Sequence, residues 1–75
     1  MNLYVFKNVL WDYSPGLVII AAYGYSQAME FAVAEFNELA TWGSIYYEKG
    51  WDEPTVYALD EKVQPGLREY VWGGA

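Results

Sequence analysis

Carboxylates carry most of the chemical potential of this sequence, because its 75 residues include no histidine and no cysteine. Three of them, Glu48, Asp52 and Glu53, surround a single lysine in the stretch SIYYEKGWDEP. Two carboxylates can act as acid and base when their pKa values differ, and several oxygens together can hold a divalent cation. Carboxylates that do neither can be presented to a basic partner. These three uses demand different spacings.

The spacing of the acids disfavours catalysis. Asp52-Glu53 and Asp60-Glu61 are adjacent pairs, and adjacent residues of a strand point to opposite faces, so the members of each pair would not cooperate. The sequence also has no imidazole, no thiol and no glycine-rich phosphate loop. We therefore expect a protein that is not an enzyme and that needs no cofactor.

A metal site is disfavoured by the same residues. Calcium or magnesium needs several oxygens that converge within one loop, as in the pattern D-x-[DN]-x-[DN]-G. No stretch of this sequence matches that pattern, and the best candidates would be the two adjacent acidic pairs. We expect no bound metal.

The charge is concentrated in the middle of the chain. Ten acids against four bases give a net charge of −6, and residues 28–61 alone hold eight acids and Lys49, which sum to −7. Such a charge repels nucleic acid and anionic membranes and attracts basic protein surfaces. The apolar run Leu17–Tyr23 is far shorter than the roughly 20 residues that cross a bilayer. These features favour a soluble intracellular protein that binds neither nucleic acid nor membrane directly.

The beginning of the chain predicts a β-hairpin. Residues 3–11, LYVFKNVLW, and residues 17–23, LVIIAAY, are rich in aromatic and β-branched residues, which favour strands. Pro15-Gly16 lies between them and is typical of a tight turn.

A helix is expected to follow over residues 27–41, a stretch without glycine or proline. Ser26 is the predicted N-cap, and Gly43 lies just beyond the predicted end. An apolar stripe should pack on the sheet, and it comprises Met29, Ala32, Val33, Phe36, Leu39 and Ala40.

The remaining segments predict a second hairpin, with residues 55–59 and 67–72 joined through the turn at Gln64-Pro65-Gly66. Residues 44–54 are compatible with either a loop or a short strand. The expected fold is a single α+β domain over residues 1–75, an antiparallel β-sheet in β-β-α-β-β order with one helix packed on one face.

Both faces of the first strand are apolar, although one helix can cover only one face of a sheet. Two covers are possible for the second face: the aromatic segment 44–54, or another protein chain. The faces consist of Tyr4, Phe6 and Leu10 on one side and Leu3, Val5, Val9 and Trp11 on the other.

The polar side of the predicted helix carries Glu30, Glu35 and Glu38, with no basic residue at the helical spacings that would neutralise them. Phe31 lies among them by helical angle. Either this ring anchors a basic partner, while the charge steers the encounter, or it tucks under segment 44–54.

Together these residues predict an acidic, aromatic-anchored surface that binds a partner. Carboxylates spaced along a helix and a neighbouring loop can imitate a row of phosphates and enter a groove built for nucleic acid. The predicted partner-binding residues are Glu30, Phe31, Glu35, Glu38, Glu48, Asp52, Glu53, Asp60 and Glu61.

The strand-led start MNLYVFKNVLWDY, the acidic middle and the aromatic ending EYVWGGA resemble the small acidic anti-CRISPR proteins of phages. The resemblance implies a non-catalytic inhibitor, active in the cytoplasm of the bacterial host, that occupies the DNA-binding groove of a type I Cascade complex, type I-C included. Inhibition would proceed by DNA mimicry or by another steric route. The alternative function is a small structural or scaffold protein that homodimerises through an apolar sheet face, so both a monomer and a weak homodimer are compatible with the sequence.

Overall fold

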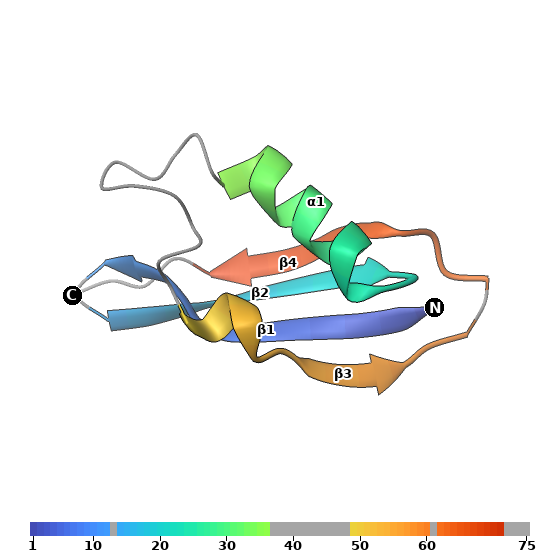
Figure 1. Cartoon of the computed structure of the whole chain (residues 1–75), viewed down its shortest axis with the longest axis horizontal. Helices are drawn as coiled ribbons and strands as arrows, with labels where there is room; N and C mark the ends of the chain where they lie inside the picture. Colours follow the sequence, from blue (N-terminus) through green and yellow to red (C-terminus); the bar gives the residue numbers. More distant parts are fainter. Residues whose placement is uncertain (13, 37–48, 61, 72–75) are drawn as a thin grey trace.

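A computed structural model describes residues 1–12, 14–36, 49–60 and 62–71 of the chain (Figure 1). It has the α+β class and the β-β-α-β-β order that the sequence predicts, with one short 3-10 helix in addition. The elements are β1 (Asn2–Asp12), β2 (Ser14–Ala22), α1 (Tyr25–Phe36), η3 (Lys49–Asp52), β3 (Thr55–Ala58) and β4 (Gly66–Val71).

The four strands form one antiparallel sheet in the order β3-β1-β2-β4. The first predicted hairpin is confirmed, because β1 pairs with β2 at the centre of the sheet. Its predicted turn is wrong: Pro15 and Gly16 lie inside β2, where Gly16 pairs with Val9. The second predicted hairpin is wrong: β3 pairs with β1 and β4 pairs with β2, at opposite edges (Figure 1). The two central strands each need a second neighbour to satisfy their outer backbone groups, and β3 and β4 supply these neighbours.

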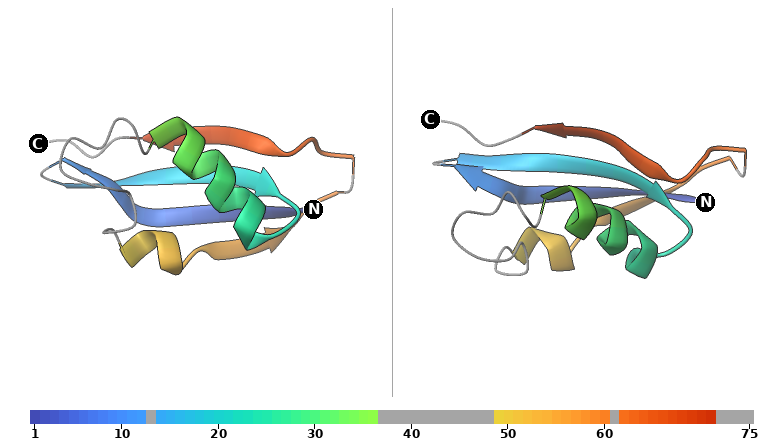
Figure 2. Two further views of the ribbon diagram at one scale, coloured as in Figure 1. Left: turned by 45° about the horizontal axis from the view of Figure 1, so that its top comes forward. Right: turned by 90° about the horizontal axis from the view of Figure 1, so that it is seen from above.

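Both helices lie on the same side of the sheet, which we call the front face (Figure 2). The hydrophobic core lies beneath them. Its centre is the ring of Trp51, which is 1% exposed and lies 5.0 Å from the Phe6 ring and 6.2 Å from the Phe36 ring, centroid to centroid. Core residues from the strands are Tyr4, Phe6, Val9, Leu10, Val18, Ile20 and Ala22, and those from α1 are Ala28, Met29, Ala32 and Phe36.

Helix α1 begins at Tyr25, two residues earlier than predicted. Ser26 is therefore inside the first turn, and its prediction as the N-cap is wrong. The amide of Tyr23 instead donates to Oε1 of Gln27 at 2.8 Å, so a side chain of the first turn reaches back to the residues that precede the helix. The described part of the helix ends at Phe36; its predicted continuation to residue 41 and the stop at Gly43 lie outside the described residues.

Strand β1 is irregular near its end, where its register against β2 shifts between Lys7 and Val9 and again before Asp12. Asn8 and Leu10 have φ angles of 60° and 52°, a left-handed conformation that costs energy for a branched side chain such as leucine. These bulges break the alternation of the strand, so that Val9 and Leu10 are both buried in the core. The sequence pattern had placed these two residues on opposite faces.

The short helix η3 packs against this irregular part of β1. A Cβ atom added at Gly50 would lie 2.0 Å from the carbonyl oxygen of Lys7 and 2.8 Å from that of Asn8. Only glycine allows this approach of two backbones. The contact fixes η3 on the front face and brings Trp51 over Phe6.

The opposite side of the sheet is here called the back face, and none of the described helices or strands lies over it (Figure 2). Segment 44–54 was one of its two predicted covers. The described part of that segment, residues 49–54, begins with η3 on the front face, so this part does not cover the back face. Residues 44–48 lie outside the described residues.

Candidate acidic binding surface

A groove of about 570 Å³ runs between α1 and η3 on the front face. The two helices lie side by side on the sheet, and the groove separates them (Figures 1 and 2). Its lining combines two acids with apolar and aromatic side chains, namely Tyr25, Ser26, Met29, Glu30, Val33, Ala34 and Asp52. The groove is open to solvent, so an extended group of a partner can enter it from the side.

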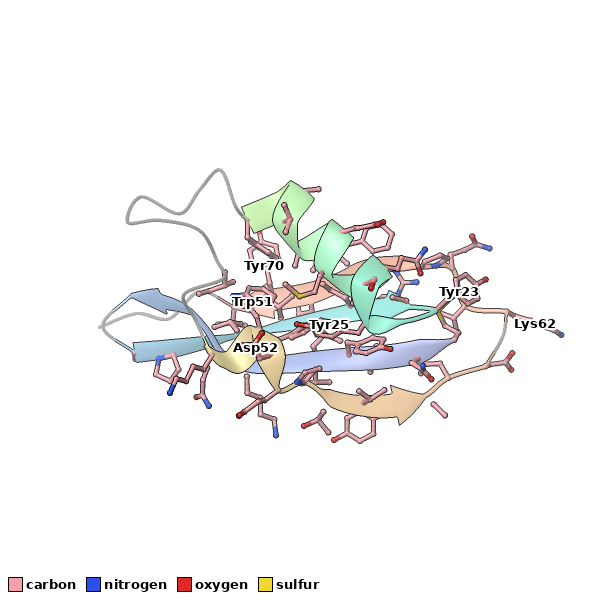
Figure 3. All side chains as sticks on the ribbon, in the orientation of Figure 1. Tyr23, Tyr25, Trp51, Asp52, Lys62 and Tyr70 are labelled. Atoms are coloured by element: carbon pink, nitrogen blue, oxygen red, sulfur yellow. The ribbon has the colours of Figure 1, made fainter. Side chains whose placement is uncertain are left out.

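Two interactions hold the walls of the groove together. The hydroxyl of Tyr25 donates to the backbone carbonyl of Trp51 at 2.8 Å, which ties the first turn of α1 to η3 (Figure 3). The Trp51 ring is buried between Phe6 and Phe36. Because Asp52 directly follows a fully packed residue, its backbone is fixed while its carboxylate stays exposed at the groove.

Glu30 and Asp52 therefore line the same groove although they come from different elements. Both are exposed, and within the described part of the chain neither forms an ion pair with a lysine or arginine. The side chain of Arg68 donates instead to the backbone carbonyl of Gln64 at the far end of the sheet. The groove thus carries two carboxylates whose charge is not neutralised by the described residues.

The other predicted acids are less closely grouped. Glu53 is exposed just beyond Asp52 but does not line the groove. Glu35 is five residues from Glu30, a rotation of roughly 140° around the helix, and so it points toward the β4 side. Asp60 lies in the connection between β3 and β4, where its Oδ1 accepts the amide of Lys62 at 3.0 Å, near the position of Lys62 labelled in Figure 3.

The structure thus brings Glu30 and Asp52 together and separates them from Glu35 and Asp60. Glu38, Glu48 and Glu61 lie outside the described residues.

Phe31 is half-buried and packs against the hydrophobic core. By helical angle it lies on the same side of α1 as Glu35, away from the groove. Part of its ring remains accessible, and its role as an anchor for a partner stays a prediction. Its predicted alternative place under segment 44–54 concerns residues that the structure does not fully describe.

Sequence reasoning missed Tyr25, the aromatic residue of the groove. It is 40% exposed and lies one turn before Met29 and two turns before Val33, so the three share one side of α1. A predicted helix that began at Tyr25 would have shown that these three residues share one side. Met29 and Val33 had been assigned wholly to the contact with the sheet, and the structure shows that they also line the groove.

The lining suits a basic side chain better than a small molecule or a metal. A guanidinium or ammonium group can bind Glu30 and Asp52, its alkyl stem can lie along Met29 and Val33, and the Tyr25 ring offers a cation–π surface. Among the described residues, no group of three acids is arranged to hold a metal ion.

Comparisons of this chain with protein-family models, with curated proteins and with solved structures give no match. The described helices include none with the length and apolar character needed to cross a bilayer. The interpretation of the site therefore depends on its own geometry and charge.

Proposed function

We propose that this protein is a non-catalytic inhibitor that binds a basic, nucleic-acid-binding complex of a bacterial host through its acidic front surface. The observation that carries the proposal is the pair Glu30 and Asp52, which line one groove and have no neutralising partner among the described residues. The sequence resemblance implies a particular form of this function, an anti-CRISPR role against a type I Cascade complex such as that of type I-C.

The proposed inhibitor competes with DNA for a channel lined by lysine and arginine. Its net charge of −6 attracts such a channel at long range, and the groove supplies the close contact. Because the charge does the steering, binding should weaken steeply as salt rises. No bond is made or broken, and the inhibitor acts in the cytoplasm where the host complex is found.

Within this proposal Glu30 and Asp52 form the centre of the contact. Glu53 extends it next to η3, while Glu35 and Phe31 extend it toward β4. Asp60 contributes at the end of the sheet, and Glu38, Glu48 and Glu61 complete the predicted acidic set.

The test is a competition assay in which purified Cascade complex binds target DNA while this protein is titrated in. We expect inhibition by the native chain. Either Glu30→Gln or Asp52→Asn should weaken it by about tenfold, a loss of ~1.4 kcal/mol of binding free energy.

A matched control separates the groove from net charge alone. Gln64→Lys changes the net charge by the same single unit, at an exposed position in the β3–β4 connection. It should weaken inhibition much less than Glu30→Gln. If the native chain does not inhibit, the proposed target is wrong; if the three variants weaken inhibition equally, the groove is not the binding site.

A further inference from the structure

The back face of the sheet carries mainly apolar side chains, of which Ala21 is fully buried. Three rows of side chains cross it, as given by the strand registers: Tyr57, Leu3 and Ala21 in the first, Thr55, Val5, Ile19 and Glu69 in the second, and Lys7, Leu17 and Val71 in the third. The residues between them along each strand point to the front face, where Tyr4, Phe6, Val18 and Ile20 are buried.

This face is too apolar for a surface that stays in water. Tyr57 is 52% exposed and Val71 is 55% exposed, while the central residues Val5 and Ile19 are half-buried by their neighbours in the sheet. None of the described helices or strands lies over them (Figure 2). Large apolar patches of this kind mark interfaces in soluble proteins.

The charge of the back face differs from that of the rest of the chain. Its rows contain one base, Lys7, and one acid, Glu69, and the side chain of Arg68, in the bulge of β4, lies 3.6 Å from the position of a Cβ atom on Gly66, so the face has no excess of acids on a chain with a net charge of −6. A basic partner would gain more at the acidic groove on the front face. An apolar surface without excess negative charge is best complemented by another apolar surface, and a second copy of the chain supplies one.

We propose that the back face binds the back face of a second copy of this chain. Two sheets pack face to face about 10 Å apart with their strands nearly aligned. A two-fold axis parallel to the strands places β1 of one copy over β2 of the other, and β3 over β4. Glu69 then lies opposite Thr55 of the second copy and next to Lys7 of that copy, so the two charged residues pair across the interface.

The other simple arrangement is electrostatically worse. A two-fold axis across the strands would place Glu69 of one copy over Glu69 of the other, and two like charges would be buried together. The axis parallel to the strands is therefore the arrangement that the charges favour.

The size of the face predicts a weak dimer. Four strands about 4.8 Å apart and roughly 20 Å long give a flat projection of ~400 Å² on each copy, before the relief of the side chains is counted. A standard interface buries about 800 Å² on each partner, so this face is about half that size and falls in the range of weak, transient interfaces. Dimerisation should be concentration-dependent. The dimer would turn its two acidic grooves outward on opposite sides, but the inference does not depend on what those grooves bind.

The experiment measures the mass of the native chain by analytical ultracentrifugation over micromolar to millimolar concentrations. We expect a monomer–dimer equilibrium. Lys7→Glu and Glu69→Lys should each weaken the dimer by at least about tenfold, because each brings like charges together. The double variant, which exchanges the two charges, should restore the dimer to within about threefold of the native chain.

Both single variants change exposed residues, so thermal unfolding can confirm that they remain folded. A further variant, Val5→Lys, tests the apolar centre of the face and should abolish the dimer. A native chain that stays monomeric throughout this range would overturn the proposal. A dimer that none of these variants weakens would overturn it as well, since it would use another surface.

Discussion

The two faces of the sheet are both apolar, but they differ in how they are covered by other parts of the chain. Both carry apolar side chains from the central strands β1 and β2. The front face is covered by α1 and η3 at its centre, where Phe6, Val18 and Ile20 are at 0% exposure, while its edge residues Val56 and Tyr70 are 49% and 41% exposed. The back face has no such cover among the described elements, and its edges expose Tyr57 and Val71.

The difference shows that coverage, and not strand composition, decides which face becomes the core. The front face is closed by residues from distant parts of the chain, above all Trp51, which contacts β1 through Phe6 and the helix through Phe36. The same elements that close the core carry Glu30 and Asp52 outward. Burial on the front face therefore positions the acidic groove, while the apolar back face has no cover among the described helices and strands.

Removal of the Trp51 side chain should have the largest effect on the front face. Trp51→Ala deletes a buried ring that lies between Phe6 and Phe36, and such truncations cost about 3–5 kcal/mol of unfolding free energy. Denaturant unfolding followed by circular dichroism measures the loss. A domain of this size has a small free energy of unfolding, so we expect the variant to be only partly folded in buffer.

The matched change on the back face is Tyr57→Ala, which also truncates an aromatic residue, here one of the edge strand β3. Its side chain is 52% exposed, so the loss should be below about 1 kcal/mol. Equal losses for the two variants at a concentration that keeps the chain monomeric would contradict the distinction between a closed and an uncovered face.

The parts of this fold that sequence reasoning predicted are the local ones. The β1–β2 hairpin was recognised because Pro15-Gly16 lies between two β-rich runs, although both residues lie inside β2 and the chain reverses before them. The pairing of β3 with β1 and of β4 with β2 is long-range. The turn residues Pro65-Gly66 gave no sign that the connection before β4 passes from one edge of the sheet to the other.

Other features could not be read from the pattern because they depend on bulges. Val9 and Leu10 look like residues of opposite faces, and only the left-handed φ angles at Asn8 and Leu10 bring both into the core. For the same reason, the sequence predicted the residues of the site but not their arrangement. Glu30 and Asp52 were both candidates, but their meeting at one groove required η3 to dock on the bulge.

Substitution of Gly50 tests directly whether η3 docks on β1, and it should cause the next largest loss of unfolding free energy. In Gly50→Ala the new methyl group would lie 2.0 Å from the carbonyl oxygen of Lys7, so the backbone of η3 must move. We expect a loss of about 2–3 kcal/mol, because overpacking against backbone cannot be relieved by a side-chain rotation. Denaturant unfolding again gives the value.

The control for this change is Gly24→Ala, just before α1. A Cβ atom added there would have nothing within 4 Å, so the unfolding free energy should change by no more than about 0.5 kcal/mol. If both alanine variants were equally stable, the close approach of η3 to β1 would not exist in solution, and the groove would lose its fixed wall.

The smallest expected effect concerns the hydrogen bond that joins the two walls of the groove. Tyr25→Phe removes the hydroxyl that donates to the carbonyl of Trp51 at 2.8 Å and leaves the ring in place. A bond of this kind contributes about 0.5–1.5 kcal/mol to stability, so we expect a loss within that range.

Tyr23→Phe is the matched control, since Tyr23 is 64% exposed and its hydrogen bond to Gln27 is made by the backbone amide and not by the hydroxyl. It should leave stability unchanged. Amide hydrogen exchange adds a local readout: loss of the Tyr25 hydroxyl should speed exchange in η3 and the first turn of α1 while the central strands stay protected. Uniformly faster exchange in all elements would instead mean that the bond supports the whole core and not the groove in particular.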